Sequence, residues 1–209
     1  HDFRPDYRYV GRFIKKMAGT GPMPPILCLT ATAKQDVVSD LKDHFHEKLG
    51  VDLRLLDGGA TRTNLEFSVI PTTPGEKFAH IHQVLLEGLP TAMPGGAIVY
   101  CASRRQTEEV ADFLRQKGLL AGHFHAGLPP ESKKVALEGF IRGDLRVICA
   151  TNAFGMGIDK PDVRLVIHAD IPGSLENYLQ EAGRAGRDRQ AASCVLLYTR
   201  DDVEKQFGM

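Results

Sequence analysis

The chain has 209 residues, of which 43% are hydrophobic and 25% are charged, as in an ordinary globular protein. Lys and Arg together number 26, and so do Asp and Glu, so the formal net charge is zero. A net charge of zero excludes nucleic-acid binding that is driven by an overall positive charge. Any such binding must come from a local basic patch.

The four cysteines lie far apart, each inside an apolar run, and none forms a CxxC pair. We therefore expect buried free thiols rather than a zinc site or a disulfide framework, and an intracellular, reducing location such as a bacterial cytoplasm or nucleoid. No apolar run is long enough to span a membrane, and no signal-peptide pattern is present. Because the chain begins with His1, we expect a processed terminus or a piece of something longer.

Short apolar runs alternate with amphipathic stretches, which predicts an α/β fold with a mostly parallel sheet flanked by helices. The runs at 97–100 and 165–167 are apolar on both faces, as strands in a covered parallel sheet must be. The expected strands are 26–29, 66–70, 97–101, 121–124, 145–150, 165–168 and 194–198. The expected helices are 5–17, 34–49, 76–89, 104–117, 130–142, 174–182 and 201–207.

A domain boundary is predicted near residue 70. The Pro-Thr-Thr-Pro-Gly run at 71–75 interrupts the pattern, and the glycine-rich segment 50–62 precedes it. Residues 71–209 hold enough strands for a complete domain. Residues 1–70 hold too few, so we expect them to be the end of another domain.

Hydroxyl, imidazole, amide and charged side chains follow several of the predicted strands. Ligands of open parallel sheets gather at the carboxyl ends of the strands. A row of such groups and helix N-termini along one edge suits phosphates spaced along a polymer. These residues are Thr30, Thr32, Ser103, Arg104, Arg105, His125, Thr151, Asn152 and Asp170.

A second candidate is the run Gln-Glu-Ala-Gly-Arg-Ala-Gly-Arg-Asp at 180–188. On a helix, Gln180, Arg184 and Arg187 would be spaced i, i+4, i+7 and would share one face. Two clustered guanidiniums are suited to a polyanionic phosphate, and the intervening glycines would let a ligand or backbone approach closely.

Each of these features has a plainer alternative. Thr32 and Ser103 could be helix caps only, and His125 could be a satisfied loop histidine. The two arginines could be a solvated helix end that pairs with Glu181 and Asp188. The glycines of the Phe-Gly-Met-Gly run could serve only a tight turn.

The run TNAFGMGIDKPDV at 151–163, followed by QEAGRAGRD at 180–188, resembles motifs V and VI of RecQ-type DNA helicases of superfamily two. The resemblance covers essentially the whole chain, with its motifs in the family's order. Its other parts are HDFRPDY at 1–7, like the tail of the family's aromatic-rich loop, LTATA at 29–33 (motif III), YCASR at 100–104 (motif IV) and HAGL at 125–128.

The chain also departs from the family's pattern. The Walker A lysine loop, the DEAH box and the adenine-reading glutamine motif are absent, as are the zinc-binding module and the winged helix. The resemblance therefore implies the end of a first RecA-like lobe (1–70) and a whole second lobe (71–209). We expect the 209-residue chain to bind no cofactor or metal and to be inactive by itself.

The resemblance implies 3′-to-5′ DNA unwinding driven by ATP and Mg²⁺, in repair or recombination, with ATP between two lobes. It implies that Arg187 is an arginine finger to the γ-phosphate, with Arg184 beside it and Gln180 coupling the cleft to DNA. Gly157 and Asp159 would lie near the ribose and the seam between the lobes.

The resemblance also implies a path for single-stranded DNA across both lobes. Its phosphates would be held by Ser103, Arg104, Thr151 and Asn152, with His125 nearby. Thr30 and Thr32 would couple the nucleotide to DNA, and Phe3 and Arg4 would belong to a loop that senses single strands.

Two rival functions stay open. An RNA-unwinding motor of the same superfamily is disfavoured because its motif VI commonly begins with His where this chain has Gln180. A non-enzymatic α/β module that binds nucleic acid or protein is favoured by the missing P-loop, but it gives the two arginines no role. In either case, zero net charge predicts weak DNA binding with a shallow salt dependence.

Overall fold

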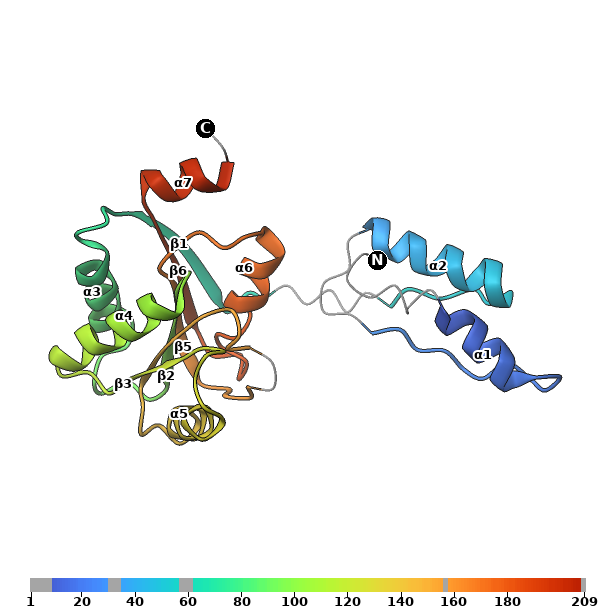
Figure 1. The fold of residues 1–209 in the computed structure, drawn as a ribbon, viewed down its shortest axis with the longest axis horizontal. Helices are drawn as coiled ribbons and strands as arrows, with labels where there is room; N and C mark the ends of the chain where they lie inside the picture. The colour runs from blue at the N-terminus through green and yellow to red at the C-terminus, as the bar shows by residue number, and fades with distance from the viewer. Residues whose placement is uncertain (1–8, 30–34, 57–61, 156–157, 208–209) are drawn as a thin grey trace. The chain divides into compact units, whose positions relative to one another are not determined.

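The computed structural model describes residues 9–29, 35–56, 62–155 and 158–207, and the chain forms two compact units, His1–Ala60 and Thr61–Met209 (Figure 1). No helix among these residues is long and apolar enough to cross a membrane. Five of the predicted functional residues lie outside the described ranges: Phe3, Arg4, Thr30, Thr32 and Gly157.

The first unit consists of two helices, α1 (Val10–Ala18) and α2 (Gln35–Leu49), which pack against each other. Their close approach depends on Gly11, where a Cβ would lie 3.1 Å from the Nε2 of His44. The strand expected at 26–29 is not formed. No strand is found among the described residues of this unit, so that run has no neighbour to satisfy its backbone N–H and C=O groups.

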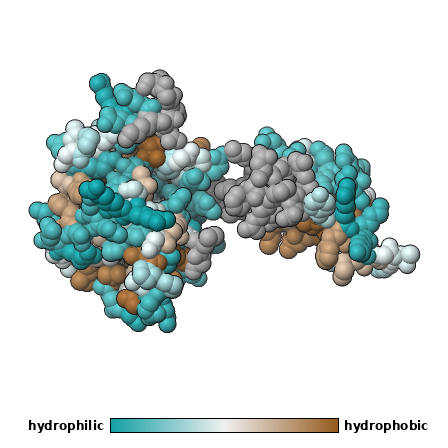
Figure 2. Space-filling view, viewed as in Figure 1, coloured by the Kyte–Doolittle hydropathy of each residue, from teal (hydrophilic) through white to brown (hydrophobic). Residues whose placement is uncertain are grey.

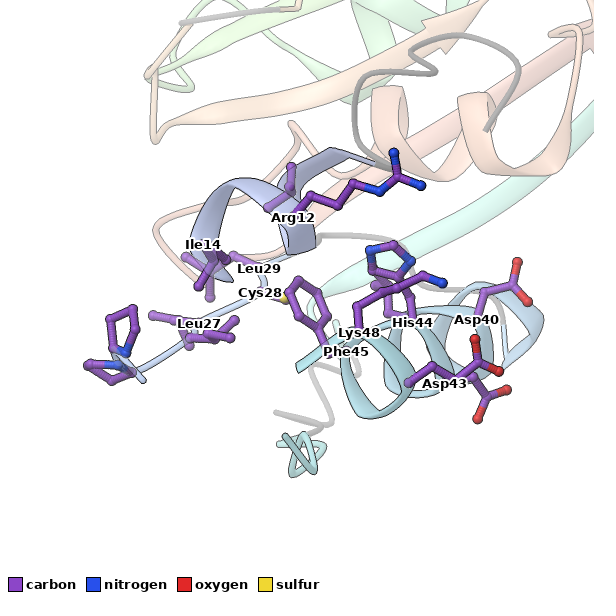
Figure 3. Close-up of a pocket in the computed structure, with 16 residues that line it drawn as sticks. Arg12, Ile14, Leu27, Cys28, Leu29, Asp40, Asp43, His44, Phe45 and Lys48 are labelled. Atoms are coloured by element: carbon purple, nitrogen blue, oxygen red, sulfur yellow. The ribbon is translucent and has the colours of Figure 1, made fainter. Parts of the chain in front are cut away.

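The first unit has little core of its own. Among its described residues only Gly11 and Phe45 are buried, whereas Leu27 and Leu29 are 77% and 84% exposed. Figure 3 shows Phe45 pointing from α2 toward the segment that carries Leu27 and Cys28, in an open groove of about 900 Å³. Figure 2 shows apolar atoms gathered on one side of this unit. Cys28 is exposed, so the expectation that all four thiols are buried is wrong for Cys28.

The second unit is built on a six-stranded sheet in the order β1-β6-β5-β2-β4-β3, in which every pair is parallel (Figure 1). The predicted α/β fold with a parallel sheet is confirmed. Its strands are β1 (Leu65–Pro71), β2 (Gly96–Tyr100), β3 (Ala121–Phe124), β4 (Val147–Ala150), β5 (Val163–His168) and β6 (Ala192–Tyr198). Its helices are α3 (Lys77–Gly88), α4 (Arg104–Gln116), α5 (Pro130–Arg142), α6 (Leu175–Ala182) and α7 (Arg200–Phe207).

The sheet is covered on both faces. Alternate residues of β2 point to opposite sides, and all five are buried. Ala97 and Val99 belong to a core cluster with residues of α3 and α4, whereas Ile98 and Tyr100 belong to a second cluster with Phe140 of α5 and Ala182 of α6. The apolar runs predicted to be two-sided are therefore central strands.

The domain boundary differs from the one predicted near residue 70. The second unit begins at Thr61, and β1 pairs with β6 from Leu65↔Ala192 to Pro71↔Tyr198. The Pro-rich run at 71–75 is thus the connection from β1 to α3 and does not separate two domains. An edge strand whose residues are mostly exposed carries a weak sequence signal, and its partner lies more than a hundred residues away.

Lys77 forms a buried ion-pair network at the carboxyl edge of the sheet. Its Nζ lies 2.6 Å from Asp170 and 3.3 Å from Asp202, and only 9% of its side chain is exposed. Asp170 also accepts a hydrogen bond from the Ala102 N–H at 3.0 Å. Burial acts to raise the pKa of Asp202, but hydrogen bonds from Thr199 and the charge of Lys77 hold that pKa below its usual value. Asp170, expected among the ligand-facing residues, thus lines the pocket at this edge and also pairs with Lys77.

Replacing Lys77 with Met should lower the free energy of unfolding by about 3 kcal/mol, because two buried carboxylates lose their cation. The exposed Lys134→Met is the control and should change it by less than about 0.5 kcal/mol. The depressed pKa of Asp202 stabilises the fold above about pH 4, and this contribution is lost as the pH falls through the folded pKa. Urea unfolding at pH 7 and pH 3 tests this. Equal stability of Lys77→Met and Lys134→Met at pH 7 would contradict it.

Candidate functional site

A pocket of about 240 Å³ lies at the carboxyl edge of the sheet. Thr151 and Asn152, which follow β4, line it together with Tyr100 at the end of β2. Asn177 and Glu181 from α6 complete the wall. The structure therefore brings two of the predicted DNA-contacting residues to the position where ligands of parallel sheets gather.

Ser103 caps the helix that begins beside this pocket. Its Oγ accepts a hydrogen bond from the Gln106 N–H at 3.2 Å, so its predicted alternative role as a cap is confirmed. The hydroxyl hydrogen is still a free donor for a phosphate oxygen. The first turn of α4 carries no acid, and it presents Arg104 and the exposed Arg105.

Arg104 and His125 lie against the same glycine. A Cβ at Gly127 would be 3.0 Å from the Nη1 of Arg104 and 3.2 Å from the Nδ1 of His125. The His125 side chain is only 6% exposed, and its Nε2 lies 2.8 Å from Glu108 Oε1. The Nε2 of His125 thus has a partner, as the alternative of a loop histidine expects, but its buried Nδ1 has none among the described residues.

The helical face expected for Gln180, Arg184 and Arg187 is not formed, because α6 ends at Ala182. Gly186 has φ +54°, which an L-residue side chain rarely tolerates, and the chain turns there. We call residues 183–190 the arginine turn. The spacing of the three residues was right for a helix, but the glycines between them end it.

Arg184 packs against the segment that follows β4. A Cβ at Gly155 would lie 2.6 Å from the Nη2 of Arg184, so a larger residue there would displace this guanidinium. The hydroxyl of Tyr100 donates to the Phe154 carbonyl at 2.9 Å. Burial raises the pKa of Tyr100, and the charge of Arg184 opposes this rise. Residues from three of the resemblance's motifs thus meet around one cation.

Arg187 reaches the same segment further along. Its Nη1 donates to the Ile158 carbonyl at 2.8 Å and lies 3.4 Å from Asp159 Oδ1. The guanidinium-bearing side chain is 36% exposed and that of Asp159 is 89% exposed. Both groups are therefore open to a ligand, and the predicted neighbourhood of Arg187 and Asp159 is present.

The acids named in the solvated-helix alternative have other partners. Both oxygens of Asp188 accept from Arg164 at 2.6 Å, and this hydrogen bonding lowers the pKa of Asp188. Glu181 lies 3.0 Å from the Nε2 of the buried His168. Neither acid pairs with Arg184 or Arg187 through its side chain in the contacts of the described residues, and the carboxylate that faces Arg187 is Asp159.

Two residues that the sequence did not single out hold the arginine turn. Arg62 Nη2 donates to the carbonyls of Ala185 and Gly186 at 2.6 and 2.7 Å. Asn64 Nδ2 donates to the carbonyls of Gly186 and Gln190 at 2.9 and 2.8 Å. These partners lie more than 120 positions apart in the chain, and no local pattern marks them.

The arginine turn and the carboxyl-edge pocket are separate surfaces. The Gly186 N–H donates to the Val163 carbonyl at 2.8 Å, and the Asp188 N–H donates to the Pro161 carbonyl at 3.2 Å. These carbonyls lie at the start of β5, whereas the pocket lies beyond its other end. The two surfaces lie at opposite ends of β5, and α6, which lines the pocket with Asn177 and Glu181, leads into the arginine turn.

Residues 76–189 match the family described as the helicase conserved C-terminal domain. The chain belongs to this helicase family. The helicase domain is 42% identical, over 97% of the chain, to RecQ-like DNA helicase blm-1 of Caenorhabditis elegans. It is 36% identical, over 99% of the chain, to ATP-dependent DNA helicase RecQ of Bacillus subtilis. The resemblance to RecQ-type helicases is confirmed.

The chain spans 20% and 33% of the length of these two relatives. Among solved structures, it is similar to the Escherichia coli DEAD-box protein SrmB bound to the regulator of ribonuclease activity RraA, with a TM-score of 0.58 and 24% identity. That match covers 66% of this chain and 78% of the other. It supports the predicted RecA-like fold.

Proposed function

We propose that this chain is the second RecA-like lobe, with the end of the first, of an intracellular ATP-dependent 3′-to-5′ DNA helicase of RecQ type. The complete enzyme would couple ATP hydrolysis to DNA unwinding in repair or recombination. The names of its relatives describe ATP-dependent and RecQ-like DNA helicases. The observation that carries the proposal is that the arginine turn holds two guanidiniums, those of Arg184 and Arg187, close together in one loop.

The residues present fit a polyphosphate. Arg184 has a buried Nε without a partner among the described residues, beside the space that Gly155 leaves open. Arg187 and Asp159 are open to solvent next to it. When bound, ATP with Mg²⁺ would supply the free energy of the cycle. Arg187 would stabilise charge that develops on the γ-phosphate, Arg184 would hold the neighbouring phosphate, and Asp159 would lie toward the ribose.

We propose that the carboxyl edge carries single-stranded DNA. Ser103 and Arg104 at the start of α4, and Thr151 and Asn152 after β4, would hold phosphates there. Gln180 lies on α6, the helix that runs from this edge toward the arginine turn, and would couple the two surfaces. On the first-lobe side, the coupling residues would be Thr30 and Thr32, and the single-strand sensor would contain Phe3 and Arg4.

The sparse core of residues 1–60 supports their assignment to a larger lobe. An α-helical pair whose described residues bury little besides Phe45 exposes more apolar surface than an independent domain tolerates. The side chains of Phe13 and Met17 are 63% and 71% exposed on α1. In the proposed enzyme, the remainder of the first lobe would cover them.

The purified 209-residue chain should show no DNA-stimulated ATPase activity, because its sequence has neither the Walker A lysine nor the DEAH acid. The measurement is phosphate release with and without single-stranded DNA, beside the chain carrying Arg187→Ala. Turnover by the unaltered chain above that of the variant would show that the chain holds a complete site and would refute this part of the proposal.

The DNA-binding proposal is tested by competition between single-stranded DNA and RNA of the same sequence. We expect weak binding that prefers DNA and falls gently with salt, since few phosphates are contacted. Arg104→Ala should weaken it and reduce the slope of log K against log salt by about 1. Arg142→Ala, on the last turn of α5, is the control. A preference for RNA would favour the RNA-unwinding alternative.

A further inference from the structure

Three metal-ligand side chains gather at the edge strand β3, apart from the arginine turn and the carboxyl-edge pocket. His123 is the second-last residue of β3, and His125 directly follows the strand. Because the two are two positions apart in extended chain, their imidazoles lie on the same side of it. Glu108 comes from α4, which packs on β3. One ligand atom from each of the three lies within 4.8 Å of the other two.

The two imidazoles have unused nitrogen atoms. The Nδ1 atoms of His123 and His125 are both buried without a partner in the described part of the chain, which is costly unless something satisfies them. The rings stack with centroids 5.8 Å apart and planes 12° apart.

The donor set matches zinc. Two imidazoles and one carboxylate are the ligands of an open zinc site, with a fourth position left for water or another oxygen, whereas Mg²⁺ and Ca²⁺ prefer oxygen ligands alone. Zinc bonds of about 2.0–2.2 Å place tetrahedral ligand atoms about 3.4 Å apart. The Glu108 carboxylate lies 2.8 Å from the His125 Nε2 and would have to move slightly away from it, and its 49% exposure leaves room for this.

The positive charges of Arg115 and Arg104 do not prevent a metal cation from binding to this cluster. Arg115 is paired with Asp112 and donates to the Ala121 carbonyl, so its charge is largely offset. The Nη1 of Arg104 and the Nδ1 of His125 both lie near the Gly127 Cβ position, whereas the nitrogen of His125 that faces Glu108 is Nε2.

We propose that Glu108, His123 and His125 form a binding site for zinc or a similar late first-row divalent cation. The site is independent of the nucleotide chemistry and of the zinc-binding module that the chain lacks. His125 and Arg104 both lie near Gly127. A bound metal would therefore hold in place the loop after β3, which lies beside the proposed DNA surface.

The test is calorimetric titration of zinc chloride into the 209-residue chain carrying Cys28→Ser, which removes the exposed thiol. We expect one saturable site that excess Mg²⁺ does not displace. When cobalt(II) replaces zinc, we expect d–d absorption bands in the visible spectrum, which are typical of cobalt with few ligands in an asymmetric arrangement. Zinc should also raise the Tm.

Glu108→Gln and His123→Ala should each weaken zinc binding by more than about tenfold, since even outer partners of zinc ligands are worth roughly 10–100-fold. Glu108 is largely exposed, so its variant will fold, as circular dichroism can verify. His82→Ala on α3, outside the cluster, is the matched control and should bind as before. Absence of saturable binding, or equal binding by Glu108→Gln and the control, overturns the proposal.

Discussion

In a complete helicase that contains this chain, Arg187→Ala should lower kcat for DNA-stimulated ATP hydrolysis by about 10³–10⁵ while nucleotide binding is largely retained. The guanidinium is held by the Ile158 carbonyl and lies 3.4 Å from Asp159, yet a third of the side chain is exposed. It is thus placed in advance for charge that develops only in the transition state, which affects kcat more than ground-state binding. Steady-state phosphate release and the Kd of a fluorescent nucleotide measure the two effects.

Arg142→Ala is a suitable control for this experiment, because that side chain is a comparably long, exposed guanidinium that pairs with Asp144 near the surface. It should leave kcat unchanged within about twofold. Hydrolysis by Arg187→Ala at the unaltered rate would show that the finger assignment is wrong. A rise in nucleotide Kd that accounts for the whole loss would mean that Arg187 only binds the ground state.

The parts of the fold that could be predicted from the sequence are those with strong local signals. The bounds of α5 were predicted as they stand, since Pro130 begins the helix and Gly143 follows it with φ +89°. The buried strands β2 and β5 were found from apolar runs with two covered faces. Both signals depend on a few adjacent residues, and tertiary packing agrees with them.

The failures arise where a pattern needs a distant partner. The apolar run at 26–29 resembles a buried strand but has no neighbouring strand in the described first unit. Arg184 and Arg187 have helical spacing, but Gly186 ends that geometry. The position of Thr151 and Asn152 at the pocket could be predicted from the strand that precedes them. The support from Arg62 could not, because β1 and β6 become neighbours only when the sheet forms.

The support that Arg62 gives to the arginine turn leads to the second large effect. In the complete helicase, Arg62→Ala should lower kcat by about 10–100-fold, since misplacing a catalytic group by about 1 Å can cost about 100-fold. Three charge-assisted hydrogen bonds, to the Gly183, Ala185 and Gly186 carbonyls, would be lost. The affinity for single-stranded DNA should not change, because the turn lies at the start of β5, away from the DNA edge.

A merely structural role for Arg62 would give a different result. In the 209-residue chain, Arg62→Ala should accelerate hydrogen exchange at the Gly186 and Asp188 amides, which bond to the start of β5, while the amides of β2 keep their protection.

Arg62→Lys should recover little of the lost activity, since one ammonium cannot span two carbonyls as the forked guanidinium does. Arg142→Ala, which removes an exposed pair with Asp144, should change neither kcat nor exchange. Faster exchange throughout the sheet would mean that Arg62 stabilises the whole unit. Faster exchange confined to the turn would mean that the catalytic arginines are positioned from a residue that precedes the first strand.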